Sequence, residues 1–328
     1  MTTPSLNSSV ARAFSRHRYS LLDLVLLGAA VATFFLADLY LALATAVLIM
    51  IVFALSLDIA QGYGGIETLG HAAFFGTGAY AAGLYAMHVS PEPISGLFVG
   101  MAAAAVVGLL SGLAVLRTAG LTQIMLTLVC ATLLLELANV AKPLTMGDDG
   151  LTGYSVAPVL GLFQFDIEGR TAYWYALAVL VLVYAFCKFL VSSPLGLTAQ
   201  GVRENPTRMA LLGVPVRRRL LTLYAISAAL GGAAGALSAQ VNNIVGLDSL
   251  GFTMSANVLV MLALGGTGRL YGAFLGAIVF MLLADRAAAL DPTNWLAALG
   301  VLLIVVVRFA PTGLSGCLAR WTSREGTQ

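Results

Sequence analysis

The sequence predicts an all-α polytopic membrane protein, and three observations support this fold class. Hydrophobic residues make up 59% of the 328 residues, whereas Asp, Glu, Lys and Arg make up only 10%, against about 25% in soluble proteins. The mean hydropathy of +0.93 means that the apolar residues are too many for one water-facing core. Several apolar runs also reach the roughly 20 residues that a helix needs to cross about 30 Å of hydrocarbon. A soluble protein is therefore excluded.

The charge balance and the cysteines exclude two further classes. A formal net charge of +2 is too small to indicate a nucleic-acid partner. The three cysteines, Cys130, Cys187 and Cys317, are odd in number and lack C-x-x-C spacing, and two of them lie in apolar runs. Such a set forms neither a disulfide framework nor a zinc cluster. We therefore expect no nucleic-acid contact and no metal site.

The apolar runs predict the helices in chain order. Seven of them lie near residues 21–37, 39–57, 69–87, 94–116, 121–141, 171–191 and 220–240. The next stretch, residues 256–284, is too long for one simple span and is interrupted by Gly265-Gly266-Thr267-Gly268-Arg269. We divide it into two short helices, residues 256–264 and 270–284. A last run at residues 295–309 gives about ten transmembrane or half-membrane helices.

The positions of Lys and Arg predict the orientation, because cytoplasmic loops carry an excess of both. The N-terminal arm holds Arg12, Arg16 and Arg18, so we expect it in the cytoplasm. With ten crossings, fourteen of the 17 basic residues then fall on the cytoplasmic side. Treating residues 256–284 as one helix would place the C-terminal arginines on the wrong side. Both termini are therefore predicted to be cytoplasmic, in an inner or plasma membrane.

The first apolar run has one alternative interpretation, a signal peptide that ends near Ala42-Leu43-Ala44. That tripeptide lies inside the second apolar run, and an arm of twenty residues is long for a signal peptide, so we expect the first helix to be retained. The predicted organisation is a cytoplasmic arm (residues 1–20), a single transmembrane domain (residues 21–313) and a cytoplasmic tail (residues 314–328). Glycines four residues apart, such as Gly108 and Gly112 or Gly231 and Gly235, indicate close helix packing.

Two glycine-rich segments interrupt the apolar runs, one in each half of the chain. The first contains Gly62-Tyr63-Gly64-Gly65, and the second contains Gly265-Gly266-Thr267-Gly268. Unwound backbone at membrane depth is tolerated only where protein buries it or where it lines a cavity. Glycine-interrupted helices at corresponding places in two halves of a chain indicate a transport pathway between the halves. The two halves of this sequence share no long identity and are only loosely related. Packing kinks are the alternative. The candidate pathway glycines are Gly62, Gly65, Gly265 and Gly266.

Ionisable residues within apolar runs are costly and tend to be functional. Asp58, Glu67 and His71 are candidate pathway residues, and Glu136 is a further candidate. The structural alternatives are a helix end for Asp58, a helix cap for Glu67, and a backbone hydrogen bond for His71. Glu67 and His71 lie four residues apart on one helical face, but two residues without a third ligand make a weak metal or acid–base site. No nucleophile or third orienting group supports an enzyme.

The loop of residues 192–219 predicts a short helix outside the membrane. Asn205 is a favourable N-cap, and Pro206 suits the first helical position, where its missing N–H is not needed. Gly213 suits the residue that follows the helix, and Pro215 prevents its continuation. A generic basic loop near anionic lipid would explain the charges of this loop, but not a capped helix that contains apolar residues.

At this loop the sequence resembles the LivM-like integral permeases of ABC importers for branched-chain amino acids and amides. In that family a helix at this position couples the permease to the ATPase. Three further segments agree with the family pattern: residues 62–80, 147–153 and 264–277. The resemblance covers residues 51–313. It assigns the following residues to ATPase coupling: Arg203, Glu204, Asn205, Ala210, Leu212, Gly213, Val214 and Pro215.

The resemblance implies a permease subunit that passes a small solute from a periplasmic binding protein into the cytoplasm of a bacterium. The solute would be a branched-chain or other amino acid, or a related amide or carboxylate. The implied partners are a second related permease in a heterodimer, two ATP-binding subunits, the binding protein and membrane lipid. The chain lacks the phosphate-binding motif G-x-x-x-x-G-K-S/T. We therefore expect no cofactor on this chain, with ATP and Mg held by the ATPase subunits.

Asp58 and Glu67 depart from the family pattern, which commonly places an amide or a hydroxyl near Asp58 and an amide at Ile66-Glu67. An acid that faces the cavity would favour an amino group or another hydrogen-bond donor on the solute. The alternative function is an ion-coupled secondary transporter or channel, in which Asp58, Glu67 and Glu136 carry the coupling ion.

Overall fold

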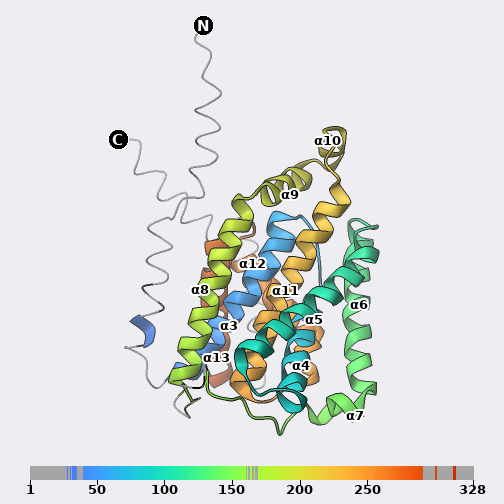
Figure 1. Ribbon diagram of the computed structural model, residues 1–328. Coiled ribbons are helices and arrows are strands. Elements are labelled where there is room, and N and C mark those ends of the chain that lie inside the picture. Colours follow the sequence, from blue (N-terminus) through green and yellow to red (C-terminus); the bar gives the residue numbers. More distant parts are fainter. Residues whose placement is uncertain are drawn as a thin grey trace, which may run out of the picture.

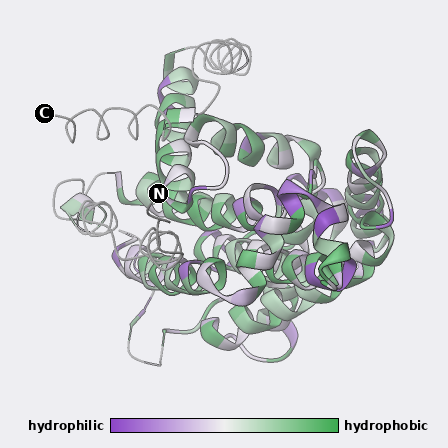
Figure 2. Cartoon of the chain, turned by 90° about the horizontal axis from the view of Figure 1, so that it is seen from above, coloured by the Kyte–Doolittle hydropathy of each residue, from purple (hydrophilic) through white to green (hydrophobic). Residues whose placement is uncertain are grey.

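The computed structural model describes residues 40–159 and 169–290, with isolated positions outside these ranges, and this part of the chain is a bundle of helices (Figure 1). In the described residues, β structure is limited to two isolated antiparallel bridges, of which Leu151 with Val245 joins two loops. Figure 2 shows that apolar residues predominate along the helices. The fold is therefore the predicted all-α polytopic membrane architecture.

Eight longer helices form the bundle. They are α3 (Leu41–Leu57), which continues as the π-helix η2 (Asp58–Tyr63), α4 (Ala72–His88), α5 (Pro93–Val115), α6 (Leu121–Val140), α8 (Arg170–Ser192), α11 (Val216–Asn242), α12 (Phe252–Gly265) and α13 (Leu270–Leu290), counted among the described residues. The shorter elements are α7 (Lys142–Thr145), η3 (Gly147–Asp149), α9 (Pro194–Glu204), α10 (Pro206–Leu211) and η4 (Leu247–Leu250). Six of the described helices are long and apolar enough to cross a membrane; α4, with 17 residues, and α12, with 14, are shorter.

The observed helices match eight of the predicted ones within a few residues at most ends. The break between α12 and α13 is present, as the glycines of that segment predict. Two ends differ more. The second predicted helix continues to Tyr63 as η2, and α13 continues to Leu290, past the predicted end at residue 284 and past Asp285 and Arg286. Charged side chains at the end of a helix are tolerated because they reach the membrane interface. The predicted helices at residues 21–37 and 295–309, the arm and the tail lie outside the described residues, apart from isolated positions.

The core of the bundle is built on α3 and α11. In the most apolar stretch of each of these two spans, 67% of the residues are buried. The α4, α5 and α11 helices approach one another through glycines, as the four-residue spacing predicts. A Cβ atom on Gly100 of α5 would lie 2.8 Å from the carbonyl oxygen of Gly78 on α4, and one on Gly108 would meet Ala228 of α11. Between helices in an apolar solvent, van der Waals contact of this kind is a main source of attraction.

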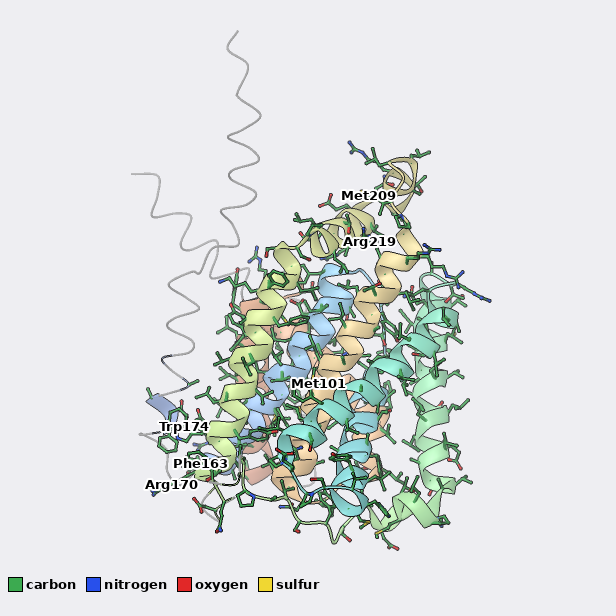
Figure 3. All side chains as sticks on the ribbon, viewed as in Figure 1. Met101, Phe163, Arg170, Trp174, Met209 and Arg219 are labelled. Carbon is green, nitrogen blue, oxygen red and sulfur yellow. The ribbon has the colours of Figure 1, made fainter. Side chains whose placement is uncertain are left out.

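The basic residues of the described chain separate between the two ends of the bundle. Arg117, Lys188, Arg203, Arg208, Arg217, Arg218, Arg219 and Arg269 lie at the end that carries α9 and α10, whereas Lys142, Arg170 and Arg286 lie at the opposite end. Figure 3 shows the separation for Arg219 and Arg170. At the first end, Arg217 Nη2 donates to the carbonyl oxygen of Leu113, 2.9 Å away, at the end of α5. The separation of eight residues from three agrees with the charge bias that predicted the topology.

The loops at the opposite end are held to the bundle by buried hydrogen bonds. Leu151 and Val245 exchange two backbone hydrogen bonds, of 2.8 and 3.0 Å. The hydroxyl of Tyr154 donates to the carbonyl oxygen of Ala239, 2.8 Å away, and Tyr154 is buried. Together these bonds fix the predicted glycine-containing segment of residues 147–153 against the end of α11.

The glycine contacts between the helices lead to a stability prediction. Replacing glycine by alanine inside a helix normally favours the helix by about 0.8–1 kcal/mol. At Gly78, however, a Cβ atom would lie 2.7 Å from the carbonyl carbon of Gly232, which is backbone and cannot move aside. We expect Gly78→Ala to destabilise the fold by about 1–3 kcal/mol, the usual cost of overpacking. Thermal unfolding in detergent measures the change.

The matched control is Val106→Leu, which adds one methylene group to an exposed position of α5. Its unfolding temperature should equal that of the wild type within about 1 °C, since exposed substitutions change stability little. An increase in the unfolding temperature of Gly78→Ala would contradict the close α4–α11 contact.

Candidate functional site

The first glycine break follows directly on a π-helical turn. In η2 the helix widens, and it then ends with three backbone hydrogen bonds: Gly64 N to Ile59 O at 3.2 Å, Gly65 N to Gln61 O at 3.2 Å, and Ile66 N to Ala60 O at 3.0 Å. Gly65 has a φ of 66°, a left-handed conformation that a side chain disfavours. The helix continues as η2 to Tyr63, beyond its predicted end at residue 57. The chain then leaves the helix at Gly65, within the predicted glycine-rich segment. Turns of this π type are frequent at functional sites.

The second break separates α12 from α13 by a tight turn. Gly266 and Gly268 have φ values of 97° and 74°. On either side of the turn the two helices lie in close contact, because a Cβ atom on Gly272 would lie 2.5 Å from the carbonyl oxygen of Gly266. With 14 residues at 1.5 Å each, α12 is about 21 Å long. It is too short to cross about 30 Å of hydrocarbon.

The two breaks touch each other, and Asp58 joins them. The N–H of Gly268 donates to Asp58 Oδ1 with an N···O distance of 2.7 Å. Asp58 has an exposed fraction of 0%, and its other oxygen, Oδ2, has no hydrogen-bond partner in the described part of the chain. A Cβ atom on Gly62 would lie 2.6 Å from Gly268 N, so a side chain at position 62 would separate the breaks. This contact brings together Asp58 and Gly62 from one predicted half and Gly268 from the other.

Arg203 of α9 completes this cluster from the side of the loop. Its Nη1 donates to the carbonyl oxygen of Gly62, and a Cβ atom on Gly268 would lie 3.1 Å from the same nitrogen. The stem of Arg203 packs on Gly65, where an added Cβ atom would lie 2.9 Å from Cγ. A Cβ atom on Gly62 would also meet Asp58 Oδ1, so the Asp58 carboxyl group and the Arg203 guanidinium both lie against Gly62. We call the set of Asp58, Gly62, Arg203 and Gly268 the glycine-break junction.

His71 lies in a separate buried cluster at the start of α4. Its exposed fraction is 1%, and its Nε2 is 2.9 Å from the hydroxyl of Ser56. The ring stacks on Phe53 with centroids 5.5 Å apart and meets Phe74 edge-on. One residue further on, the N–H of Ala72 donates to Ser255 Oγ of α12 at 2.9 Å, a second link between the halves. The structure therefore places His71 within the protein core.

The predicted acidic residues do not form one group. Asp58 is fully buried, whereas Glu67 is exposed beyond the first break, and Glu136 is exposed on α6. No group of three or more His, Cys, Asp or Glu residues that could hold a metal occurs among the described residues. An apolar cavity of about 350 Å³ lies between α3, α8 and α13, and the lining residues described for it include none of the predicted pathway residues.

The loop after α8 contains the predicted capped helix, α10. Asn205 is its N-cap, with Oδ1 accepting from the N–H of Arg208 at 2.9 Å, and Pro206 occupies the first helical position. Gly213 has a φ of 81°, which fits the residue after a helix. Leu211 and Leu212 are 85% and 70% exposed. Leu211 is the last residue of α10 and Leu212 follows it, so both apolar side chains are exposed outside the bundle.

Sequence reasoning missed the 11-residue helix α9, which lies before α10. Of the residues assigned to coupling, Arg203 and Glu204 belong to α9, and Ala210 belongs to α10. Asn205 lies between the two helices, as the residue that ends α9 and caps α10, and the other four, Leu212, Gly213, Val214 and Pro215, follow α10. The signal for α9 was present in the sequence, because Ser193 is its N-cap and Pro194 its first residue; Ser193 Oγ accepts from Gly196 N at 3.3 Å. The inward contact of Arg203 and the buried Ser56 and Ser255 were also missed.

Comparison with known proteins places these features in a family. Residues 39–307 match the family described as "Branched-chain amino acid transport system / permease component". The chain is 30% identical to the high-affinity branched-chain amino acid transport system permease protein LivM of Escherichia coli, over 83% of this chain and 69% of that protein. Identity to LivM of Salmonella typhimurium is 27% with the same coverage.

A shorter match, of 26% identity over 39% of this chain and 42% of the relative, is to the permease protein LivH of Escherichia coli. No solved structure shows significant similarity. The family match spans the described bundle, both glycine breaks and the loop that contains α9 and α10. The chain therefore belongs to the family of permease components of branched-chain amino acid transport systems.

Proposed function

We propose that this chain is one permease of an ATP-binding-cassette importer, and that α10 is the surface that receives the motion of the ATPase. The observation that carries the proposal is the exposed apolar pair Leu211 and Leu212 beside α10, at the end of the bundle that holds most of the basic residues. That end would face the cytoplasm, with the arm and the tail on the same side. ATP and Mg would be held by two separate ATP-binding subunits.

The remaining partners follow from the family. The relatives include both LivM and LivH permease proteins, which supports a multi-subunit system. We propose a heterodimer with a second, related permease in a bacterial inner membrane, supplied by a periplasmic binding protein. The relatives named for branched-chain amino acids support a solute of that class, or another amino acid or related amide or carboxylate. The single transmembrane domain of residues 21–313 would form one side of the pathway.

The alternative of an ion-coupled transporter gains no support from the described residues. Coupling ions at membrane depth are held by groups that converge on one site. Here Asp58 is buried at the glycine-break junction, whereas Glu67 and Glu136 are exposed at other places. A separate ATPase that acts through α10 requires no such convergence.

The role of α10 is tested by a double substitution, Leu211→Asp with Leu212→Asp. Burial of one leucine at an interface contributes about 1.5–3 kcal/mol, so the two charges should lower the amount of copurified ATPase subunit at least about tenfold. The permease should still insert in the membrane, because both residues lie outside the bundle. Quantitative copurification from detergent extracts measures the effect.

The control for that experiment carries the same charge at the other end of the bundle. Val89, at the end of α4, is 71% exposed, and Val89→Asp should leave copurification of the ATPase unchanged. Normal copurification of the double leucine variant would remove the basis of the coupling role.

The energy source gives a second test. Proteoliposomes that hold both permeases and the ATPase subunits should accumulate solute only when ATP is inside and the solute-loaded binding protein is outside. An imposed ion or proton gradient without ATP should give no accumulation, because the acidic residues that the structure describes do not converge on an ion site. Accumulation driven by the gradient alone would favour the ion-coupled alternative. A ligand screen of the binding protein identifies the solute to use.

A further inference from the structure

The glycine-break junction joins three segments that are far apart in the sequence. The bond from Gly268 to Asp58 spans 210 residues, and the bond from Arg203 to Gly62 spans 141 residues. Two of these segments are the glycine breaks of the two halves, and the third is the last turn of α9. The junction is therefore the place where the loop outside the bundle meets both irregular backbone segments inside it.

The two breaks are in direct backbone contact at the junction. A Cβ atom on Gly62 would lie 2.6 Å from Gly268 N, so no side chain fits between them. The Gly268 N–H lies in a turn with positive φ, outside any helical ladder, and Asp58 Oδ1 satisfies it. Separation of the breaks would leave that donor unpaired.

The hydrogen bond from Gly268 does not by itself require an acidic side chain at position 58. One of its two oxygens has no partner among the described residues, and burying a carboxylate incompletely paired is costly. An amide or a hydroxyl would also accept the bond from Gly268. A carboxyl group differs from these because it can carry a negative charge beside the Arg203 guanidinium, since Asp58 Oδ1 and Arg203 Nη1 both lie against Gly62. The charge of Asp58 thus favours the position of α9 against the breaks.

Arg203 connects this attraction to α10. It lies two residues before Asn205, the residue that ends α9 and caps α10. The stem of Arg203 packs on Gly65, and its Nη1 donates to the carbonyl oxygen of Gly62. The side chain therefore contacts the first break at two glycines. Only Glu204 and Asn205 separate Arg203 from Pro206, the first residue of α10, so Arg203 is close to α10 along the chain.

We propose that Asp58 and Arg203 are positioning residues, which hold both glycine breaks to α9 so that a displacement of α10 moves the two breaks together. This inference rests on the proposed coupling of α10 to an ATPase, and it adds the path by which that coupling reaches the inside of the bundle. Neither residue needs to touch the solute.

The test uses the reconstituted importer and three variants of the junction. Arg203→Met keeps the stem on Gly65 and removes the donor, Asp58→Leu removes the acceptor, and Asp58→Asn keeps the acceptor for Gly268 and removes the charge. The measured quantities are ATPase copurification, the rate of ATP hydrolysis, and the number of solute molecules taken up per ATP.

We expect Arg203→Met and Asp58→Leu to retain the ATPase subunit and to hydrolyse ATP, while solute uptake per ATP falls about tenfold, which corresponds to the loss of one charged hydrogen bond. Asp58→Asn should show a smaller loss. The double variant Arg203→Met with Asp58→Leu should be no worse than the more affected single variant, because residues of one network are non-additive.

Two control variants separate positioning from general damage. Arg218→Met removes an exposed positive charge from the same end of the bundle, at the start of α11. Tyr154→Phe removes a buried hydrogen bond of 2.8 Å at the opposite end. Both should keep wild-type uptake per ATP, even where Tyr154→Phe lowers the unfolding temperature.

The outcomes distinguish this inference from the proposed function. Wild-type uptake per ATP in Arg203→Met and Asp58→Asn would overturn the positioning role, and it would leave the role of α10 intact. Additive losses in the double variant would also overturn it. Failure of the wild-type chain to bind an ATPase subunit through α10 would instead overturn the proposed function.

Discussion

This structure depends on one constraint, the need of every backbone polar group in an apolar solvent for a hydrogen-bond partner. Each N–H and C=O group at membrane depth needs a partner within the protein, since the lipid offers none. Regular helices meet this need internally, but the glycine breaks do not. The carboxylate of Asp58 therefore accepts from Gly268, Arg203 donates to Gly62, and Ser255 accepts from Ala72. Asp58 is the buried charged residue of this set, and it lies where the backbone leaves its helices.

The same constraint explains why glycines are concentrated where helices and breaks meet. Contacts such as those of Gly78 with Gly232 and of Gly62 with Gly268 bring backbone against backbone, which leaves no room for lipid between the segments. Buried polar side chains lie on the central helices α3 (Thr45 and Ser56) and α11 (Ser227 and Gln240), and also on the helices packed around them, α6 (Gln123 and Thr127) and α12 (Ser255). Close packing and polar support are parts of one arrangement.

Local patterns in the sequence predicted most of the fold and the capped helix α10. The length of an apolar run predicts a helix from that run alone, and α10 is marked by Asn205-Pro206 at its start and Gly213 after its end. The junction could not be predicted in this way. Asp58 and Gly268 are 210 residues apart, and nothing in either segment specifies the other as a partner. His71, which the sequence made a candidate pathway residue, lies among Phe53, Ser56 and Phe74. Its role in transport stays a prediction.

The π-helical turn of Asp58–Tyr63 also constrains the length of the chain. A π turn holds about one more residue than an α turn, and each residue of an α-helix advances by about 100° around the axis. Removing one residue from this segment would restore a regular helix and rotate the Asp58 carboxylate and the Gly62 carbonyl relative to each other by about that angle. One of them would then face away from its partner. The number of residues in this segment is thus as much a part of the site as their identity.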